Sequence, residues 1–137
     1  MRRPRLHHHL RIEQRGGAAV AGVDVQPHAV VLGDLGEAWS FSKLNKAFRL
    51  LMQQPQPRLL ALGMTRYWRA EDGLQLDVAP FVMALSHAAG VDPLVLGKPA
   101  MSFYQAAVGM LGVARDQVVM LGDDIRGDIE GALNAGL

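Results

Sequence analysis

Short apolar runs recur along the chain from residue 29 onwards, and each is followed by glycine or proline and then by a segment with helical periodicity. Runs of three or four apolar residues bounded by such breakers are typical of buried strands. The runs that we predict as strands are 29–32, 59–62, 94–96 and 118–121. Because strands that alternate with helices of about ten residues favour parallel pairing, the pattern predicts an α/β fold with a parallel sheet.

Start and stop signals mark the helices between these runs. Ser42 can cap a helix whose apolar residues recur on one face, and Pro80 suits the first position of a second helix. Gly90 and Gly112, each followed by valine, are typical stops after two of the helices. The segments that we predict as helices are 43–52, 80–89, 101–111 and 128–134.

The segment 63–73 is polar and contains two adjacent aromatic residues, which predicts a loop. Arg66, Tyr67 and Trp68 combine positive charge with aromatic rings, and loops on a rigid scaffold often carry specificity. These side chains suit contact with a ligand, but they could equally pack over a neighbouring element. The sequence leaves both interpretations open.

Composition narrows the class of protein. Half of the 137 residues are hydrophobic, yet no apolar run approaches the length of about 20 residues that spans a bilayer. The chain contains no cysteine, which excludes disulfides, thiol catalysis and cysteine–zinc sites and fits a cytoplasmic location. The net charge is only +1, and the positive excess lies near the N-terminus. The rest of the chain therefore has no excess of positive charge that would attract nucleic acid.

Residues 1–28 differ in composition from the rest of the chain. They contain five arginines, three consecutive histidines and no sustained hydrophobic period. This segment could be a basic arm that binds nucleic acid, or its histidines could bind a metal. The composition favours a disordered tail or a wrongly assigned start.

Three carboxylates follow the last predicted strand: Asp123, Asp124 and Asp128. Open α/β sheets place their chemistry at the carboxyl ends of the strands, and clustered carboxylates are usually compensated by a hard cation. Aspartates at the start of a helix can equally serve as caps. The spacing alone does not decide between a metal site and a helix cap.

Lys98 follows the preceding predicted strand, in the sequence Gly97-Lys98-Pro99, and is therefore expected at the same sheet edge as the three acids. A fixed positive charge beside a metal site suits an anionic substrate. Phosphoryl transfer fits best, because its catalysis depends mainly on positioning and charge neutralisation. Mg²⁺ is the expected ion, since it favours few carboxylates together with water and phosphate oxygens.

Two motifs resemble motifs three and four of the haloacid-dehalogenase (HAD) superfamily of phosphatases, both in sequence and in their separation along the chain. They are Val95-Leu96-Gly97-Lys98-Pro99 and the run 118–128. Upstream segments resemble the α/β cap of its subfamily IIA: 41–52, 66–68, 72–74 and 76–81. The resemblance implies a cap at 29–96 and, at 97–137, the C-terminal half of a Rossmann-like parallel core. It implies an incomplete core sheet and a chain that is a fragment.

The resemblance also implies a role for each matching residue. Lys98 would bind the phosphoryl group and orient the nucleophile, and Asp123 would be the Mg²⁺ ligand. Asp124 and Asp128 would support the metal site or Lys98. Cap residues between 64 and 77 would influence which small phosphorylated substrate, or pyrophosphate, is admitted.

One family motif is missing from these 137 residues. The family attacks phosphate with the first aspartate of an Asp-x-Asp motif, whose second aspartate acts as general acid–base. Neither Asp24-Val25-Gln26 nor Asp34-Leu35-Gly36 supplies that second aspartate. We therefore expect no phosphatase activity from this polypeptide alone. The alternatives are a non-catalytic remnant that binds a partner or phosphate, and a truncated gene model.

An incomplete core sheet has a physical consequence. It would leave an unpaired strand edge and exposed apolar faces on the helices at 80–89 and 101–111. We therefore expect homodimerisation or aggregation.

Overall fold

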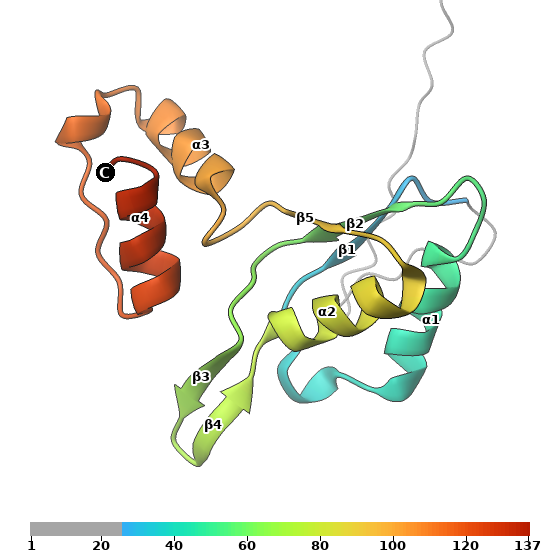
Figure 1. Cartoon of the computed structure of the whole chain (residues 1–137). Helices are drawn as coiled ribbons and strands as arrows, with labels where there is room; N and C mark the ends of the chain where they lie inside the picture. The colour runs from blue at the N-terminus through green and yellow to red at the C-terminus, as the bar shows by residue number, and fades with distance from the viewer. Residues whose placement is uncertain (1–25) are drawn as a thin grey trace, which may run out of the picture.

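The computed structural model describes residues 26–137, so most of the predicted tail lies outside the described residues. A sheet with two helices comes first, and a helical segment follows it (Figure 1). The strands are β1 (Ala29–Leu32), β2 (Arg58–Ala61), β3 (Tyr67–Ala70), β4 (Gly73–Leu76) and β5 (Pro93–Val95). The α-helices are α1 (Phe41–Leu51), α2 (Val78–Ala89), α3 (Met101–Leu111) and α4 (Gly131–Asn134). Short turns are η1 (Gly36–Ala38), η2 (Arg115–Gln117) and the π-helical turn η3 (Ile125–Glu130).

The main sheet has the strand order β1-β2-β5, and both pairs are parallel. Val30 lies opposite Leu59, and Leu60 lies opposite Leu94. The three strands fall within one residue of the predicted runs, which confirms the predicted α/β fold with a parallel sheet. The carboxyl ends of these strands share one edge, and the chain leaves this edge after β5 toward Lys98.

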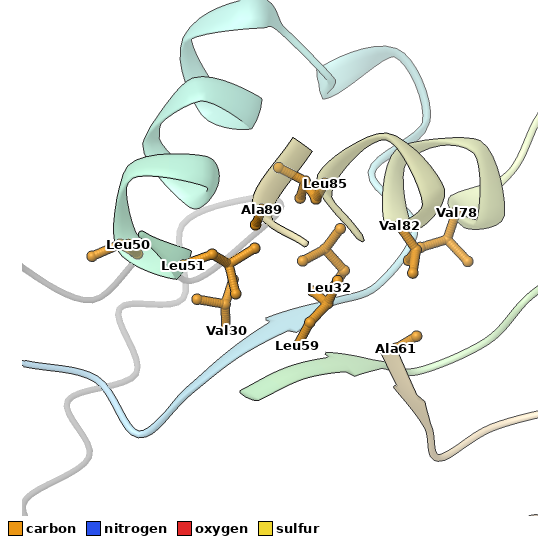
Figure 2. Packing of buried hydrophobic residues seen from close by; sticks show 10 residues of the cluster. All are labelled: Val30, Leu32, Leu50, Leu51, Leu59, Ala61, Val78, Val82, Leu85 and Ala89. Atoms are coloured by element: carbon orange, nitrogen blue, oxygen red, sulfur yellow. The ribbon is translucent and has the colours of Figure 1, made fainter. Parts of the chain in front are cut away.

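The hydrophobic core lies between this sheet and the helices α1 and α2 (Figure 2). Leu51 from α1, Leu59 from β2 and Val82 from α2 are completely buried there. Burying one such side chain contributes about 1.5–3 kcal/mol. Trp39 lies in the loop before α1, and Phe81 lies in α2. Their rings stack with centroids 4.2 Å apart, so this loop also packs against α2.

The two N-terminal helix caps differ from the predictions. Ser40, and not Ser42, caps α1 by accepting a hydrogen bond from the Lys43 N–H at 3.3 Å. Asp77 caps α2, so Pro80 occupies the third helical position and not the first. Both differences arise because a polar side chain two residues before the expected cap reaches the free N–H groups first.

Two further predictions about the elements were wrong. The expected loop contains an antiparallel hairpin in which Tyr67 pairs with Leu76 and Ala70 pairs with Gly73. The apolar run 118–121 forms no strand, and Val119 and Leu121 are 80% and 86% exposed. An apolar run becomes a buried strand only beside a partner strand. In the described part of the chain the main sheet ends at β5.

The helical segment after β5 has a small cluster of its own. Tyr104, Ala132 and Ala135 are buried in it, with Met120 and Leu137 packed against them. The outer face of α3 is exposed as predicted, but the predicted exposure of α2 was wrong because α2 covers the sheet. Among residues 26–137 no helix is both long and apolar enough to cross a lipid bilayer.

Candidate active site

Lys98 stands directly after β5, at the carboxyl edge of the parallel sheet. Gly97 lies so close to the Leu62 carbonyl that a Cβ at this position would collide with it. The Lys98 carbonyl accepts a hydrogen bond of 3.1 Å from the Met64 N–H. The backbone on both sides of this junction is therefore held against the end of β2, and this fixes the point from which the lysine side chain starts.

The Lys98 side chain forms an ion pair with Asp128. Its Nζ lies 2.5 Å from Oδ1, and the Lys98 and Asp128 side chains are 37% and 4% exposed. The hydrogen bond from Lys98, opposed by burial, holds the pKa of Asp128 below its usual value. The same bond raises the pKa of Lys98. The site is thus an almost buried carboxylate that holds a partly exposed ammonium group.

Asp124 organises the turn that carries Asp128. It caps η3, because its Oδ1 accepts a hydrogen bond of 3.1 Å from the Arg126 N–H. Its own N–H donates to Asp128 Oδ2 at 3.1 Å. A Cβ on Gly122 would collide with the Asp128 carboxylate, and one on Gly127 would collide with the Asp124 carboxylate. The two glycines therefore leave the space in which the acids fold back onto the turn.

The third acid, Asp123, is exposed, and its backbone faces the Asp128 carboxylate. Within residues 26–137 no three His, Asp or Glu side chains converge in a way that could hold a metal ion. Because Asp124 and Asp128 are engaged with N–H groups and Lys98, Asp123 is the acid of the three that fits a metal ligand. One carboxylate completed by water and phosphate oxygens is a usual arrangement for Mg²⁺.

Tyr104 is a site residue that the sequence analysis missed. It is 2% exposed on α3, and its hydroxyl donates to the Gly127 carbonyl in η3. Burial raises the pKa of this phenol. A tyrosine in a mostly apolar helix can indicate such a contact, because a buried hydroxyl needs a partner. The sequence did not indicate where that partner lies.

The cap residues named from the sequence lie on the hairpin and not in the cluster around Lys98. The Arg66 guanidinium stands 5.5 Å from the centroid of the Tyr67 ring, and Tyr67 and Trp68 are about half exposed. The Arg66 carbonyl accepts from the Asp77 N–H at 3.1 Å, which ties the hairpin to the start of α2. No hydrogen bond or ion pair between described residues joins these three side chains to Lys98 or the aspartates.

Comparison with known proteins identifies the family. Residues 95–137, which hold Lys98 and the three acids, match the family described as HAD-hydrolase-like. The chain is 43% identical over 111 residues to the human phospholysine phosphohistidine inorganic pyrophosphate phosphatase. This chain belongs to the haloacid-dehalogenase superfamily. The relatives also support the predicted subfamily IIA, and a second one, the mouse phospholysine phosphohistidine inorganic pyrophosphate phosphatase, is 39% identical over 133 residues.

Solved structures of phosphatases share the fold. A p-nitrophenyl phosphatase from Archaeoglobus fulgidus matches with a TM-score of 0.70 and 27% identity, covering 80% of this chain and 41% of that one. A glycerol phosphate phosphatase from Mycobacterium tuberculosis, solved in complex with calcium, matches with a TM-score of 0.69 and 33% identity, covering 81% and 32%. The human relative is covered over 41% of its length by 81% of this chain. The chain thus spans less than half of these proteins.

Proposed function

We propose that this chain supplies the phosphoryl-binding lysine and one Mg²⁺ ligand of a HAD-type phosphatase acting on small phosphorylated compounds or pyrophosphate. The observation that carries the proposal is the ion pair between Lys98 and Asp128 at the carboxyl edge of the sheet. Asp128 keeps the lysine protonated and directed, while the exposed part of Lys98 remains free to meet an anion. A hydrogen-bonded, charged donor of this kind suits phosphoryl oxygens.

Each residue has a distinct task in this proposal. Lys98 would donate to phosphoryl oxygens, and Asp128 would hold Lys98 in place. Asp123 would hold Mg²⁺, while Asp124 would support the turn between them. The metal, when bound, would neutralise negative charge on the phosphoryl group. The hairpin residues Arg66, Tyr67 and Trp68 would influence which substrate enters.

The 137 residues contain no Asp-x-Asp motif, and we propose that this polypeptide alone does not turn over substrate. The missing motif equally favours the second candidate, a non-catalytic module that binds phosphate. Both candidates require phosphate binding and differ only in whether a nucleophile is supplied elsewhere. The absence of cysteine favours a cytoplasmic location for either one.

Phosphate binding tests the proposal directly. Inorganic phosphate, with and without Mg²⁺, is titrated into the chain and followed by NMR. We expect Lys98→Ala to abolish binding and Asp123→Asn to remove its dependence on Mg²⁺. Lys43→Ala is the matched control, because Lys43 lies in α1 and its ammonium group is bonded to the Ala38 carbonyl. Binding that Lys98→Ala leaves intact would contradict the proposal.

Hydrolysis of p-nitrophenyl phosphate tests the absence of turnover. We expect no release of p-nitrophenol from the 137-residue chain with Mg²⁺ present. Release that disappears in Asp123→Ala would show that the chain is catalytic without an Asp-x-Asp motif, and it would overturn this part of the proposal.

A further inference from the structure

The peptide unit between Gly127 and Asp128 is held at both ends. Its carbonyl accepts the hydroxyl of Tyr104, and its N–H donates to the Asp124 carbonyl at 2.6 Å. A peptide plane that is bonded on both sides cannot rotate freely, so the direction in which the next side chain leaves the backbone is fixed. That side chain belongs to Asp128, the partner of Lys98.

The contact depends on a glycine that faces Tyr104. A Cβ at Gly131, the first residue of α4, would collide with the Tyr104 hydroxyl and crowd the edge of its ring. The phenol therefore passes over Gly131 to reach the turn. Glycine stabilises a helix less than alanine does. Gly131 therefore makes room for the Tyr104 contact at a cost to the stability of α4.

We propose that Tyr104 is a positioning residue whose hydroxyl fixes the Gly127–Asp128 peptide and thereby directs Asp128 at Lys98. The importance of this role for phosphate binding rests on the function proposed above, but the geometric claim does not. The hydroxyl is a protonated donor at neutral pH even at the ordinary pKa of tyrosine, and burial, which raises the pKa of Tyr104, extends this to higher pH. The ring itself also packs against Ala132 and Ala135, so the hydroxyl must be tested separately from the ring.

Tyr104→Phe removes only the hydroxyl, and Tyr67→Phe is the matched control. The chain has two tyrosines, and Tyr67 is half exposed on the hairpin. Two NMR signals are followed: hydrogen exchange at the Asp128 amide and the side-chain ammonium signal of Lys98. We expect Tyr104→Phe to speed exchange at Asp128 by roughly fivefold to tenfold, as for one lost hydrogen bond, and to broaden the Lys98 signal. We expect Tyr67→Phe to change neither.

A purely structural role of Tyr104 would give a different result. Exchange would then rise equally throughout α3 and α4 while the Lys98 signal stayed sharp, and that outcome would overturn the proposal. Gly131→Ala provides a second variant, because it displaces the phenol while giving α4 a better helix former. We expect it to broaden the Lys98 signal as well, and an unchanged signal would also count against the proposal.

Titration with inorganic phosphate separates this inference from the proposed function. If the unaltered chain binds phosphate, we expect Tyr104→Phe to weaken the affinity several-fold. If the unaltered chain does not bind phosphate, the proposed function fails. The exchange and ammonium signals then still decide whether Tyr104 positions Asp128.

Discussion

The Lys98 ammonium group lies 2.5 Å from the Asp128 carboxylate, and the aspartate is almost buried whereas the lysine is 37% exposed. The two side chains therefore differ in how well water can solvate them when the ion pair is broken. Water can solvate Lys98 when the pair opens, but Asp128 would keep a charge in a poorly solvated place. The aspartate thus depends on the pair more than the lysine does, and the backbone donors around it reduce that dependence only in part.

Asp128→Asn tests this asymmetry. The amide keeps an acceptor for the Asp124 N–H but removes the charge that holds Lys98, so we expect a loss of about 1–3 kcal/mol in the local stability of the segment 98–128. Hydrogen exchange measures it residue by residue. Asp116→Asn is the control, because Asp116 is exposed in η2 and should change stability by less than about 0.5 kcal/mol. Equal effects of the two substitutions would contradict the prediction.

The ion pair also predicts a pH dependence with two limits. The pKa of Asp128 is lowered, so its contribution is complete above the unfolded value of about 3.9 and is lost as pH falls through the folded value. The pKa of Lys98 is raised, so its contribution is complete below about 10.4 and is lost as pH rises through the folded value. We expect the difference in melting temperature between the unaltered chain and Asp128→Asn to be largest between these limits. A difference that stayed constant below pH 4 would refute the assignment.

Two glycine-to-alanine substitutions provide a matched pair. At Gly122 the new methyl group would collide with the Asp128 carboxylate, whereas at Gly109 in α3 it would meet nothing within 4 Å. We expect Gly122→Ala to destabilise the helical segment by about 1–3 kcal/mol through overpacking and to broaden the Lys98 ammonium signal. Gly109→Ala should stabilise it by up to about 1 kcal/mol. Thermal melts followed by circular dichroism compare the two, and a stabilising Gly122→Ala would contradict the geometry.

The sequence predicted the elements whose signals are local. Apolar runs located β1, β2 and β5, and Gly90 and Gly112 end their helices in the left-handed conformation as expected. The hairpin was missed although Tyr67-Trp68 and the Asp72-Gly73 turn were visible, because strands of four residues give a weak periodic signal. The run 118–121 was mistaken for a strand because an apolar run indicates burial but does not show whether a partner strand lies beside it.

The candidate site was predicted in its residue types and only partly in its contacts. Lys98 and Asp128 follow two different segments of the chain, and the structure brings them together in an ion pair, whereas the resemblance left open whether Asp128 supports the metal site or Lys98. The hydrogen bond of Tyr104 to Gly127 could not be predicted, because it depends on how α3 packs against η3. The ligation of a metal by Asp123 remains a prediction that the binding experiments above address.

A buried core position can test whether the cap and the core segment are independent, as the predicted division at 96/97 implies. Leu59 is completely buried in the middle strand of the sheet, and Leu59→Ala should cost about 2–5 kcal/mol in the stability of residues 29–95. Tyr104, Ala132 and Ala135 belong to the other cluster. We therefore expect the ring signals of Tyr104 to survive temperatures at which the sheet of the variant has melted. Simultaneous loss of both would indicate a single cooperative unit.

The exposed run 118–121 predicts self-association of the chain. Val119 and Leu121 present apolar side chains to solvent, and the backbone of the run pairs with no strand in the described part of the chain, which leaves it as an unpaired edge. We expect the chain to elute as a dimer or larger species in concentration-dependent size-exclusion chromatography. Replacing both residues by charge, as Val119→Lys with Leu121→Glu, should shift it toward the monomer without lowering its melting temperature. Leu74→Lys, at a similarly exposed position on the hairpin, is the control and should leave the elution unchanged. An unaltered chain that is monomeric at high concentration and melts cooperatively would show that this edge does not drive association.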